Sequence, residues 1–352
     1  MNSVTITRID GDPGKVYYPL KFDKIEIPQP NGSEVLIKVD SVSLNHRDHF
    51  IRQHLYPGTA FGVTLGSDVV GRVVALGPGV KDNTLLNARV IVYPARGWLA
   101  DPRAPEGPDF AILGGTKFYA NGAFADYILV ESADLVVHCP SHLSESGAAS
   151  IPIAGLTAYR SVFTRAQVKQ GMTVLITGCG GGVAIFAIQF AKTIGAKVLV
   201  TAGSQAKLEY AIKTLKVDGG VLYTDPAWGK QIRAYGAIDV VIDGSGGNTI
   251  LQIGSSLSLG ARIVCYGMTS GPQTAVPMVA VLKNAEFIGS TMGSLREFKE
   301  MLKFIDKHKI DPVIYKTVSG LDRIEDAFKL LMDKQRIGKI VVQLECKDQS
   351  SL

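Results

Sequence analysis

The central part of the chain alternates short apolar runs with segments of helical periodicity, and this alternation limits the fold more than any other feature. In two of the intervening segments, 183–194 and 204–216, apolar residues recur at i, i+3 and i+4. Strand–helix alternation of this kind predicts a parallel sheet with helices on both faces, a doubly wound α/β arrangement. The predicted strands lie at 173–177, 197–201, 220–224, 239–243 and 262–266.

A glycine-rich turn separates the first of these strands from the first helix. It runs from Gly178 to Ala184, and its best fit is Gly178-x-x-Gly181-x-x-Ala184, one residue longer than the common dinucleotide fingerprint. Glycine allows the backbone to approach a pyrophosphate, and the helix N-terminus offers free N–H groups and a positive dipole end. A glycine-rich turn without a ligand is the alternative, but the position after the first strand favours a cofactor site.

The second predicted strand, 197–201, is not followed by the acid that an NAD site uses to bind the ribose diol. A hydroxyl and a lysine follow instead, at Ser204 and Lys207. They suit the 2′-phosphate of NADPH, with Tyr223 at the end of the third strand flanking the adenine ribose. The alternative for Lys207 is a solvated lysine on a helix surface.

The first third of the chain is rich in β-structure. Residues 33–44 alternate apolar and polar side chains, and 69–76 and 89–93 are further short β runs. The segment 96–122 has many glycines and prolines and is expected to be a long ordered loop. Towards the C-terminus, helices at 294–309 and 324–332 and a strand at 339–344 are predicted.

Length and composition exclude several classes of protein. A chain of 352 residues is expected to divide into two domains, and an apolar content of 46% excludes a disordered chain. The net charge of +5 is too small and too dispersed for a nucleic-acid or membrane-surface protein. We find no secretory signal or membrane span and expect a cytoplasmic protein; the final Ser-Ser-Leu only faintly resembles a peroxisomal tail.

The cysteines predict neither a disulfide framework nor a structural zinc site. There are four of them, and no two form a CxxC pair. Free thiols in a reducing compartment are the simplest interpretation. The four positions are Cys139, Cys179, Cys265 and Cys346.

Several short motifs, each weak alone, occur in a specific order along nearly the whole chain. They are SLNHRD at 43–48, LGSDVVG at 65–71, NGAFADY at 121–127, GLTAY at 155–159, the glycine turn, IGS at 288–290 and IGKIV at 337–341. In this order the chain resembles the medium-chain dehydrogenase/reductase superfamily, specifically its zinc-free quinone oxidoreductase-like branch.

The resemblance implies a fold and an assembly. It implies a GroES-like β-rich catalytic domain over 1–146 and 310–352, and a Rossmann NADP(H)-binding domain over 147–309. It also implies a homodimer or tetramer, because in this family the sheet edge near 286–294 pairs across a two-fold axis. The segment 96–116 is longer than in compact quinone reductases and is expected to cap the substrate cleft, to form a surface loop or to contact another subunit.

The resemblance also bears on metal binding. In the zinc-dependent branch a cysteine, a histidine and a third ligand hold the catalytic zinc, and the matching positions here are Asn45, Ser67 and the neighbourhood of Ile153. None is a typical ligand, and an apolar side chain cannot serve. The structural-zinc lobe is absent too, because residues 90–120 contain no cysteine. We therefore expect no metal.

A new metal site is the less favoured alternative. His46, His49 and His54 cluster in sequence near Asp48, and Asp68 follows in the next motif. Ordinary polar packing of these residues is the preferred interpretation.

A zinc-free hydride-transfer site suits quinones, enones and enals, because their developing enolate charge is spread out and needs only hydrogen-bond donors. The resemblance therefore implies an NADPH-dependent, zinc-independent reductase of such substrates. Asn45, Asp48 and Tyr56 are expected to line the substrate pocket, with Asn45 or Tyr56 as donor. The alternatives are a structural carboxylate at Asp48 and an aromatic of a mobile loop at Tyr56.

The cofactor contacts implied by the motifs and strand ends extend over both parts of the chain. They are Thr157, Gly178, Gly180, Gly181, Gly182, Val183, Ser204, Lys207, Tyr223, Gly244, Gly267, Ser290, Gly338 and Lys339. Two other functions remain as alternatives: a zinc-free alcohol dehydrogenase or carbonyl reductase, and an NADPH-carrying binding protein of the crystallin or RNA-binding kind. The lack of a basic stripe with interleaved aromatics argues against RNA.

Overall fold

The computed structural model describes residues 1–271 and 273–344, and the Ser-Ser-Leu tail and Cys346 lie outside this part of the chain. The chain divides into two compact units. Unit 1 consists of Met1–Ile153 and Ser294–Leu352, and unit 2 consists of Ala154–Gly293. No described helix has both the length and the apolarity to cross a membrane.

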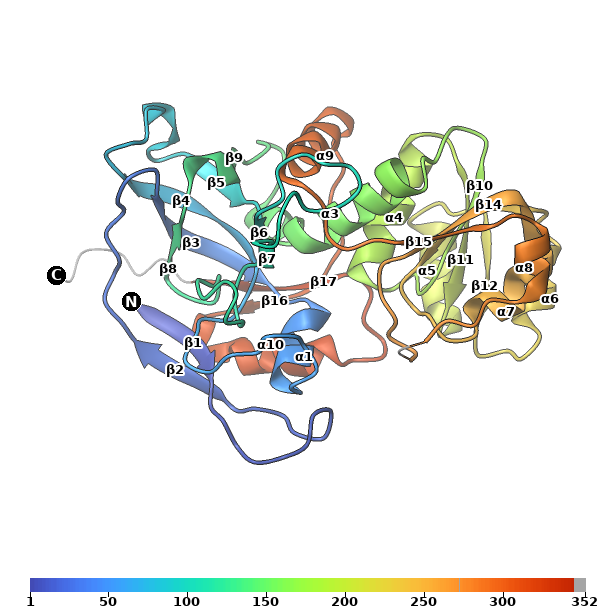
Figure 1. Ribbon diagram of the computed structural model, residues 1–352, viewed down its shortest axis with the longest axis horizontal. Coiled ribbons are helices and arrows are strands. Elements are labelled where there is room, and N and C mark those ends of the chain that lie inside the picture. Colours follow the sequence, from blue (N-terminus) through green and yellow to red (C-terminus); the bar gives the residue numbers. More distant parts are fainter. Residues whose placement is uncertain (272, 345–352) are drawn as a thin grey trace. The chain divides into compact units, whose positions relative to one another are not determined.

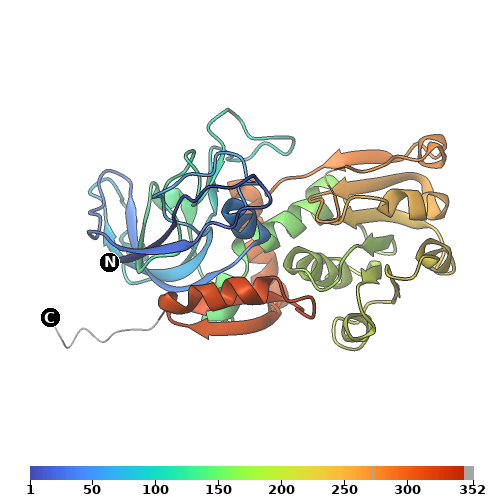
Figure 2. The same ribbon diagram turned by 90° about the horizontal axis from the view of Figure 1, so that it is seen from below.

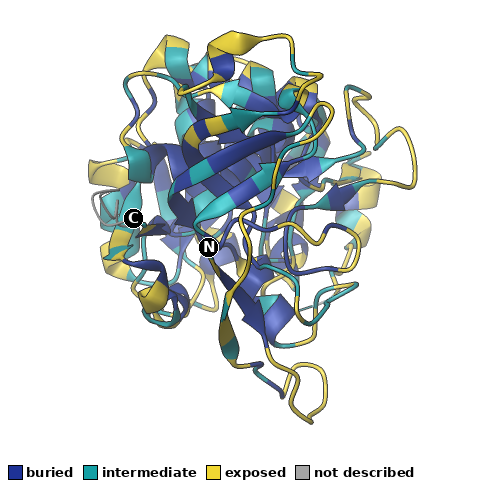
Figure 3. Ribbon diagram, turned by 90° about the vertical axis from the view of Figure 1, so that its left-hand side faces the viewer, coloured by how far each residue is buried: buried dark blue, intermediate teal, exposed yellow. Residues whose placement is uncertain are grey.

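Unit 1 contains a seven-stranded mixed sheet (Figure 1). Six strands follow the order β16-β17-β3-β4-β5-β9, and β8 pairs with β3. The bounds are β3 Val35–Ser43, β4 Asp68–Leu76, β5 Arg89–Val92, β8 Tyr127–Val130, β9 Val136–His138, β16 Ile314–Ser319 and β17 Lys339–Gln343. The predicted β-rich first third is confirmed, and its strands are mostly buried (Figure 3).

Smaller elements complete unit 1. The hairpin β1 (Asn2–Ile6) and β2 (Leu20–Lys24) and the pair β6 (Ala95–Arg96) and β7 (Ala111–Ile112) form two further two-stranded sheets. The helix α10, red in Figure 2, packs on β16 and β17. The remaining helical elements are η1 Asn83–Leu85, α1 His46–Arg52, η2 Ala133–Leu135, α2 Glu145–Ala149, α9 Leu295–His308, η5 Leu321–Arg323 and α10 Ile324–Leu331.

Unit 2 is built on a six-stranded parallel sheet in the order β12-β11-β10-β13-β14-β15, which confirms the predicted doubly wound arrangement. The strands are β10 Thr173–Ile176, β11 Lys197–Ala202, β12 Gly219–Leu222, β13 Ile238–Asp243, β14 Leu257–Cys265 and β15 Glu286–Gly289. The helical elements are α3 Pro152–Tyr159, η3 Arg160–Arg165, α4 Gly182–Thr193, α5 Gln205–Lys213, α6 Trp228–Arg233, α7 Thr249–Ile253, η4 Gly254–Ser256 and α8 Met278–Leu282.

The core of unit 2 explains why these residues form a parallel sheet. Apolar residues of β10, β11, β13 and β14 pack with α6, α7 and α8 in one buried cluster that includes Trp228. The helices α4 and α5 contact β10 and β11. Strands buried by helices read as continuous apolar runs, which is the pattern that predicted them.

The boundary between the units differs from the expected one at α9. The expected boundaries assigned 294–309 to the Rossmann domain, but the helix belongs to unit 1. The backbone N–H of Leu295 donates to the Trp98 carbonyl at 2.9 Å, and the Phe298 ring lies 5.6 Å from the Tyr93 ring. These contacts attach α9 to the segment that follows β5. They join residues far apart in sequence, so no local sequence pattern predicts them.

The segment 96–116 is an ordered loop, closed at its base by β6 and β7. Trp98 is buried, and its indole Nε1 donates to the Asp101 carbonyl at 2.8 Å. The Glu106 carboxylate accepts hydrogen bonds from the backbone N–H groups of Leu99, Ala100 and Asp101 at 2.8, 2.6 and 2.8 Å. Desolvation raises the pKa of Glu106, but these bonds outweigh it and lower the pKa to about 2.

Candidate active site

The pairing of three strands in unit 1 brings together residues that are far apart in sequence. Strand β3 is antiparallel to both β4 and β17, so its end lies beside the beginnings of its two neighbours. Ser43 at the end of β3 is opposite Asp68, the first residue of β4, and opposite Val341 of β17. Lys339 begins β17. One edge of the sheet therefore carries a hydroxyl, a carboxylate and an ammonium group.

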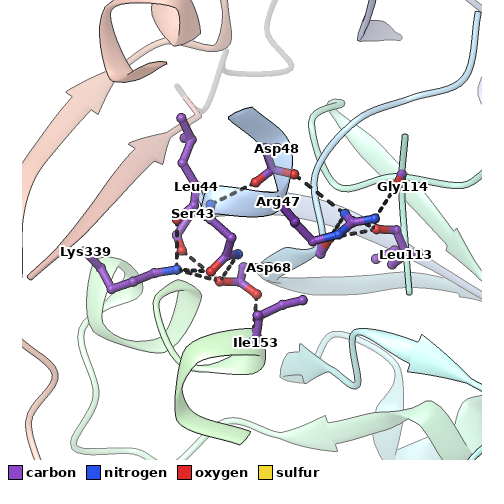
Figure 4. Close-up of polar contacts among 11 residues, drawn as sticks. Ser43, Leu44, Arg47, Asp48, Asp68, Leu113, Gly114, Ile153 and Lys339 are labelled. Atoms are coloured by element: carbon purple, nitrogen blue, oxygen red, sulfur yellow. Dashed lines mark hydrogen bonds and ion pairs between the residues drawn. The ribbon is translucent and has the colours of Figure 1, made fainter. Parts of the chain in front are cut away.

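Asp68 is the centre of this group (Figure 4). Its side chain is fully buried, and its Oδ2 accepts from Ser43 Oγ at 2.9 Å, Asn45 Nδ2 at 2.8 Å and Lys339 Nζ at 3.0 Å. Its Oδ1 accepts from the Ile153 backbone N–H at 2.9 Å. A buried carboxylate needs such donors, because desolvation of an unpaired charge is costly.

The ammonium group of Lys339 donates three hydrogen bonds, all to acceptors within unit 1. The residue is buried, and Nζ donates to the Leu44 carbonyl at 2.9 Å, Asn45 Oδ1 at 2.6 Å and Asp68 Oδ2 at 3.0 Å. Burial lowers the pKa of Lys339, and the Asp68 charge opposes this shift. We expected a cofactor contact here, but the ammonium has no proton left over for one in this geometry.

Asn45 lies between the two charged groups, and they fix the orientation of its amide. The ammonium of Lys339 can only donate, so it must face Oδ1, and the carboxylate of Asp68 can only accept, so it must face Nδ2. One Nδ2 proton is thereby used, and the second donates to no described residue. Asn45 therefore presents one oriented N–H group, next to a cation that polarises the amide.

A second buried cation lies on the neighbouring segment. The Arg47 guanidinium donates to the carbonyls of Leu113 and Gly114, each at 2.9 Å, and makes a short contact with Ser67 Oγ (Figure 4). Ser67 Oγ in turn donates to the Leu113 carbonyl at 2.7 Å. The Tyr56 ring lies 4.8 Å from the Arg47 guanidinium carbon, a cation–π contact.

Asp48 and Tyr56, the other two expected catalytic residues, lie beside this network. Asp48 is fully buried, and its Oδ2 accepts from the Asn45 backbone N–H at 2.8 Å, which caps α1. Burial raises the pKa of Asp48 to about 6. This geometry is the structural carboxylate that we considered as the alternative. Tyr56 is half-buried and packs on Arg47.

The three positions that match zinc ligands do not fit a zinc ion. The amide of Asn45 bridges two charges, the hydroxyl of Ser67 bonds to Arg47, and Ile153 offers only its backbone N–H. The cation beside Asp68 is already Lys339. Within residues 1–271 and 273–344, no group of three or more His, Cys, Asp or Glu side chains could hold a metal. No reaction step here can be derived through zinc.

In unit 2, nearly all the expected cofactor residues follow the carboxyl ends of parallel strands, and only Thr157 lies elsewhere, on α3. Gly178 has a φ of 66°, and a Cβ at Gly181 would come no closer to other atoms than 3.5 Å. Close packing therefore requires glycine at neither of these two positions, although the left-handed backbone at Gly178 favours it. No side chain caps the N-terminus of α4, which begins at Gly182. A pyrophosphate could approach the open glycine backbone and accept hydrogen bonds from the uncapped N–H groups of α4.

The end of the second parallel strand carries the expected hydroxyl and lysine. Ser204 Oγ accepts from the Lys207 backbone N–H at 3.4 Å and caps α5. Burial raises the pKa of the Cys179 thiol to about 11, and the positive charge of Lys207 acts in the opposite direction. The Lys207 side chain is half-buried and its charge acts on the glycine turn. A Cβ on Gly203 would lie 2.4 Å from the Tyr223 hydroxyl, so Tyr223 lies close to the backbone just before Ser204.

Three further residues at this edge were not predicted. Asp243, at the end of β13, is fully buried and accepts from Thr177 Oγ1 at 2.7 Å, which in turn accepts from the Gly244 N–H at 3.0 Å. The Tyr266 hydroxyl lies 2.4 Å from a Cβ position at Gly244, so only glycine fits there. The available signal was an acid, a hydroxyl and a tyrosine that are each the last residue of a predicted parallel strand.

The remaining expected contacts lie in both units. Gly267 and Ser290 follow β14 and β15, and the Ser290 N–H donates to the Cys265 carbonyl at 2.9 Å. Gly338 lies in unit 1, where a Cβ would approach the Val313 carbonyl oxygen to 2.5 Å. Glycine at that position is therefore explained by packing alone.

Comparison with known proteins identifies related chains. A family model described as an alcohol dehydrogenase GroES-like domain matches residues 31–141, and one described as a zinc-binding dehydrogenase matches residues 182–307. The chain is 41% identical to the zinc-type alcohol dehydrogenase-like protein YogA of Leptosphaeria maculans, over 94% of this chain and 96% of that one. It is 29% identical to an acryloyl-coenzyme A reductase of Sulfurisphaera tokodaii, over 92% and 96% of the two chains.

The solved structures show the same similarity. The structure of an NAD-dependent alcohol dehydrogenase matches with a TM-score of 0.85 and 30% identity, over 98% of this chain and 100% of that one. The similarity thus spans both units of the fold.

Proposed function

The chain belongs to the medium-chain dehydrogenase/reductase superfamily of nicotinamide-dependent oxidoreductases, and we propose that it is a zinc-independent reductase that uses NADPH to reduce α,β-unsaturated carbonyl compounds or quinones. The observation that carries this proposal is the oriented amide of Asn45, held between Lys339 and Asp68 with one N–H group left to donate.

The chemistry of a conjugated acceptor matches a single oriented donor. When bound, NADPH supplies a hydride to the β-carbon of the conjugated double bond. The electron pair of the double bond then moves towards the carbonyl oxygen, and the Asn45 N–H stabilises the charge that develops there. The neighbouring ammonium of Lys339 strengthens this donor by polarising the amide. A proton from water or from Tyr56 then adds to the α-carbon of the enolate and completes the reduction.

The preference for NADPH is supported by the end of the second parallel strand. It carries no acid to bind a ribose diol, and Lys207 places its charge near the glycine turn. A 2′-phosphate would gain charge-assisted hydrogen bonds there.

Zinc independence is supported by the donor set of unit 1. Asn45, Ser67 and Ile153 are already bonded to Asp68 or Arg47, and Lys339 supplies the local positive charge. The name of the acryloyl-coenzyme A reductase relative is consistent with a conjugated substrate.

An alcohol dehydrogenase or carbonyl reductase is the second candidate. The observation that favours it is the similarity to the solved NAD-dependent alcohol dehydrogenase. A simple alkoxide concentrates its charge on one oxygen and needs a stronger electrophile than an amide, which favours the first candidate.

A panel of quinones, enones, enals, ketones and alcohols, assayed with NADPH and NADH, separates the two. We expect turnover of the conjugated substrates with NADPH, no loss of activity with strong chelators, and less than about one zinc per chain after dialysis. Stoichiometric zinc whose removal abolishes turnover, or activity confined to alcohols, would overturn the proposal.

Substitutions identify the hydrogen-bond donor. Asn45→Ala is expected to reduce kcat by about 10²- to 10³-fold, which is typical for loss of one oxyanion donor. Asn83→Ala, an exposed asparagine of the same unit, is the matched control and should leave kcat unchanged. Should Tyr56→Phe produce the large loss while Asn45→Ala does not, the donor is Tyr56.

A further inference from the structure

A recess of about 410 Å³ lies in unit 1, and of its lining residues only Tyr56 was considered for the mechanism above. Its walls are formed by the segment 54–59, which follows α1, and by Lys117. No acidic side chain lines it, whereas an imidazole and an ammonium group do.

The walls of the recess are held in place by the fold. The Lys117 N–H donates to the Gly58 carbonyl at 2.9 Å, and Thr59 Oγ1 donates to the Tyr56 carbonyl at 2.8 Å. Gly58 has a φ of 72°, which favours glycine, and a Cβ there would lie 2.1 Å from the exposed Phe118 ring, which would have to move. A binding site with walls fixed in this way loses little freedom when a ligand binds.

The two basic groups are available to a ligand. Among the described residues, Lys117 forms no salt bridge, and its Nζ lies 5.5 Å from the Phe118 ring centroid. His54 Nδ1 lies 2.9 Å from the hydroxyl of the buried Tyr18. If that hydroxyl donates to Nδ1, the tautomer of His54 carries its proton on Nε2, which makes Nε2 a donor. Two donors, one of them a permanent cation, with no acid nearby favour an anion.

Tyr56 connects the recess with the Asn45 network. Tyr56 lines the recess, and its ring packs on Arg47. The Arg47 guanidinium lies 3.6 Å from Asp48 Oδ1, and Asp48 Oδ2 accepts from the Asn45 backbone N–H. The helix α1, of seven residues, lies between Asn45 and the recess. The helix separates them in sequence only, because the chain then turns back and the Tyr56 ring packs on Arg47 near the start of α1.

We propose that this recess binds an anionic group, a phosphate or a carboxylate, of a substrate whose carbonyl lies at Asn45 and whose chain extends past Tyr56. The placement of the carbonyl rests on the proposed function. Phosphate and carboxylate share the chemistry that Lys117 and His54 recognise, and the test below distinguishes them.

The test compares three enones that share one spacer and end in a phosphate, a carboxylate or a hydroxyl, and it is repeated with spacers of increasing length. We expect the wild-type protein to show a KM about 10-fold lower for at least one anionic enone than for the hydroxyl enone, with similar kcat. Lys117→Met should abolish this preference without changing KM for the hydroxyl enone. The preference should weaken at high salt, because exposed charges are screened.

One further variant is a control and another tests the imidazole. Lys81→Met removes an exposed lysine of unit 1 outside the recess and should change nothing. His54→Asn tests the second donor and keeps a residue type that tolerates the left-handed backbone at this position, where φ is 55°; it should weaken the preference for the anionic enones without changing KM for the hydroxyl enone. Equal KM values for the three enones, or equal effects of Lys117→Met and Lys81→Met, would overturn the proposal.

A binding measurement separates this proposal from the proposed function. Saturated analogues of the phosphate and carboxylate compounds cannot be reduced, and their Kd is measured by calorimetry. Tighter binding to the wild type than to Lys117→Met, by about 10-fold, supports the recess even if no enone is turned over. Turnover of the hydroxyl enone without any such difference supports the reductase and refutes the anion site.

Discussion

Lys339→Met is the substitution that most directly tests the network around Asp68. It keeps most of the side-chain volume but removes the ammonium, so the Leu44 carbonyl and Asn45 Oδ1 each lose a donor. Asp68 keeps three hydrogen-bond donors but loses the neighbouring positive charge.

The magnitude follows from the burial of both groups. The side chains of Lys339 and Asp68 are 4% and 0% exposed, and removing one partner of such a pair costs about 3–5 kcal/mol. At about 2–4 °C per kcal/mol for a domain of this size, the melting temperature of unit 1 should fall by about 6–20 °C. Asp68→Asn in the Lys339→Met background removes the stranded charge, so the double variant should lose less stability than the two single changes added together.

The assay uses the two tryptophans of the chain, one of which lies in each unit. Trp98 is buried in unit 1 and Trp228 in unit 2. In a Trp228→Phe background, tryptophan fluorescence during urea unfolding reports on unit 1 alone. A loss of less than about 1 kcal/mol for Lys339→Met, or strict additivity with Asp68→Asn, would show that the ammonium and carboxylate are not coupled and that Asn45 is oriented by something else.

The other predictions concern the cofactor, a titrating carboxylate and the assembly. Lys207→Ala should lower the ratio of kcat/KM for NADPH over NADH by roughly 10- to 100-fold, and equal losses with both cofactors would refute the phosphate contact. The pKa of Asp48 is raised from 3.8 to about 6 in the folded protein. Between these pH values the folded state holds a proton on Asp48 that the unfolded state has lost, so the stability of the protein falls as the pH rises through this range. Asp48→Asn should therefore gain about 3 kcal/mol of unfolding free energy relative to wild type between pH 4 and pH 7, whereas a constant difference across this range would contradict the raised pKa. The sheet of unit 2 ends at β15, near the exposed Leu259 and Leu282, and light scattering at micromolar concentration should give the mass of a dimer or tetramer rather than of one chain.

The fold of unit 2 could be predicted because its signal is local. Each parallel strand is a short apolar run between helical segments, and the predicted runs at 173–177 and 239–243 match β10 and β13 within one or two residues. The hairpin of β1 and β2 and the strand β16 gave no such signal, because they are short and largely polar on their exposed faces. Their place depends on pairing with distant segments.

The site of unit 1 could be predicted only in part. Asn45 was found from its motif, and the spacing of Asn45 and Asp48 fits the helix cap that the structure shows. The contact of Lys339 with Asp68, however, spans 271 residues and depends on β17 pairing with β3. No local pattern carries that information, so the lysine was assigned to the cofactor instead.

The closure of the loop around Glu106 has a consequence for how this segment can change during evolution. The carboxylate holds Leu99, Ala100 and Asp101 through their backbone N–H groups, so the clamp places no demand on their side chains. Mutations at Ala100 and at the exposed positions between Asp101 and Glu106 can accumulate without opening the loop, provided that the acid and the spacing are kept. Residues that face outwards here are therefore free to diversify, while Glu106 and the buried Trp98 hold the base of the loop unchanged.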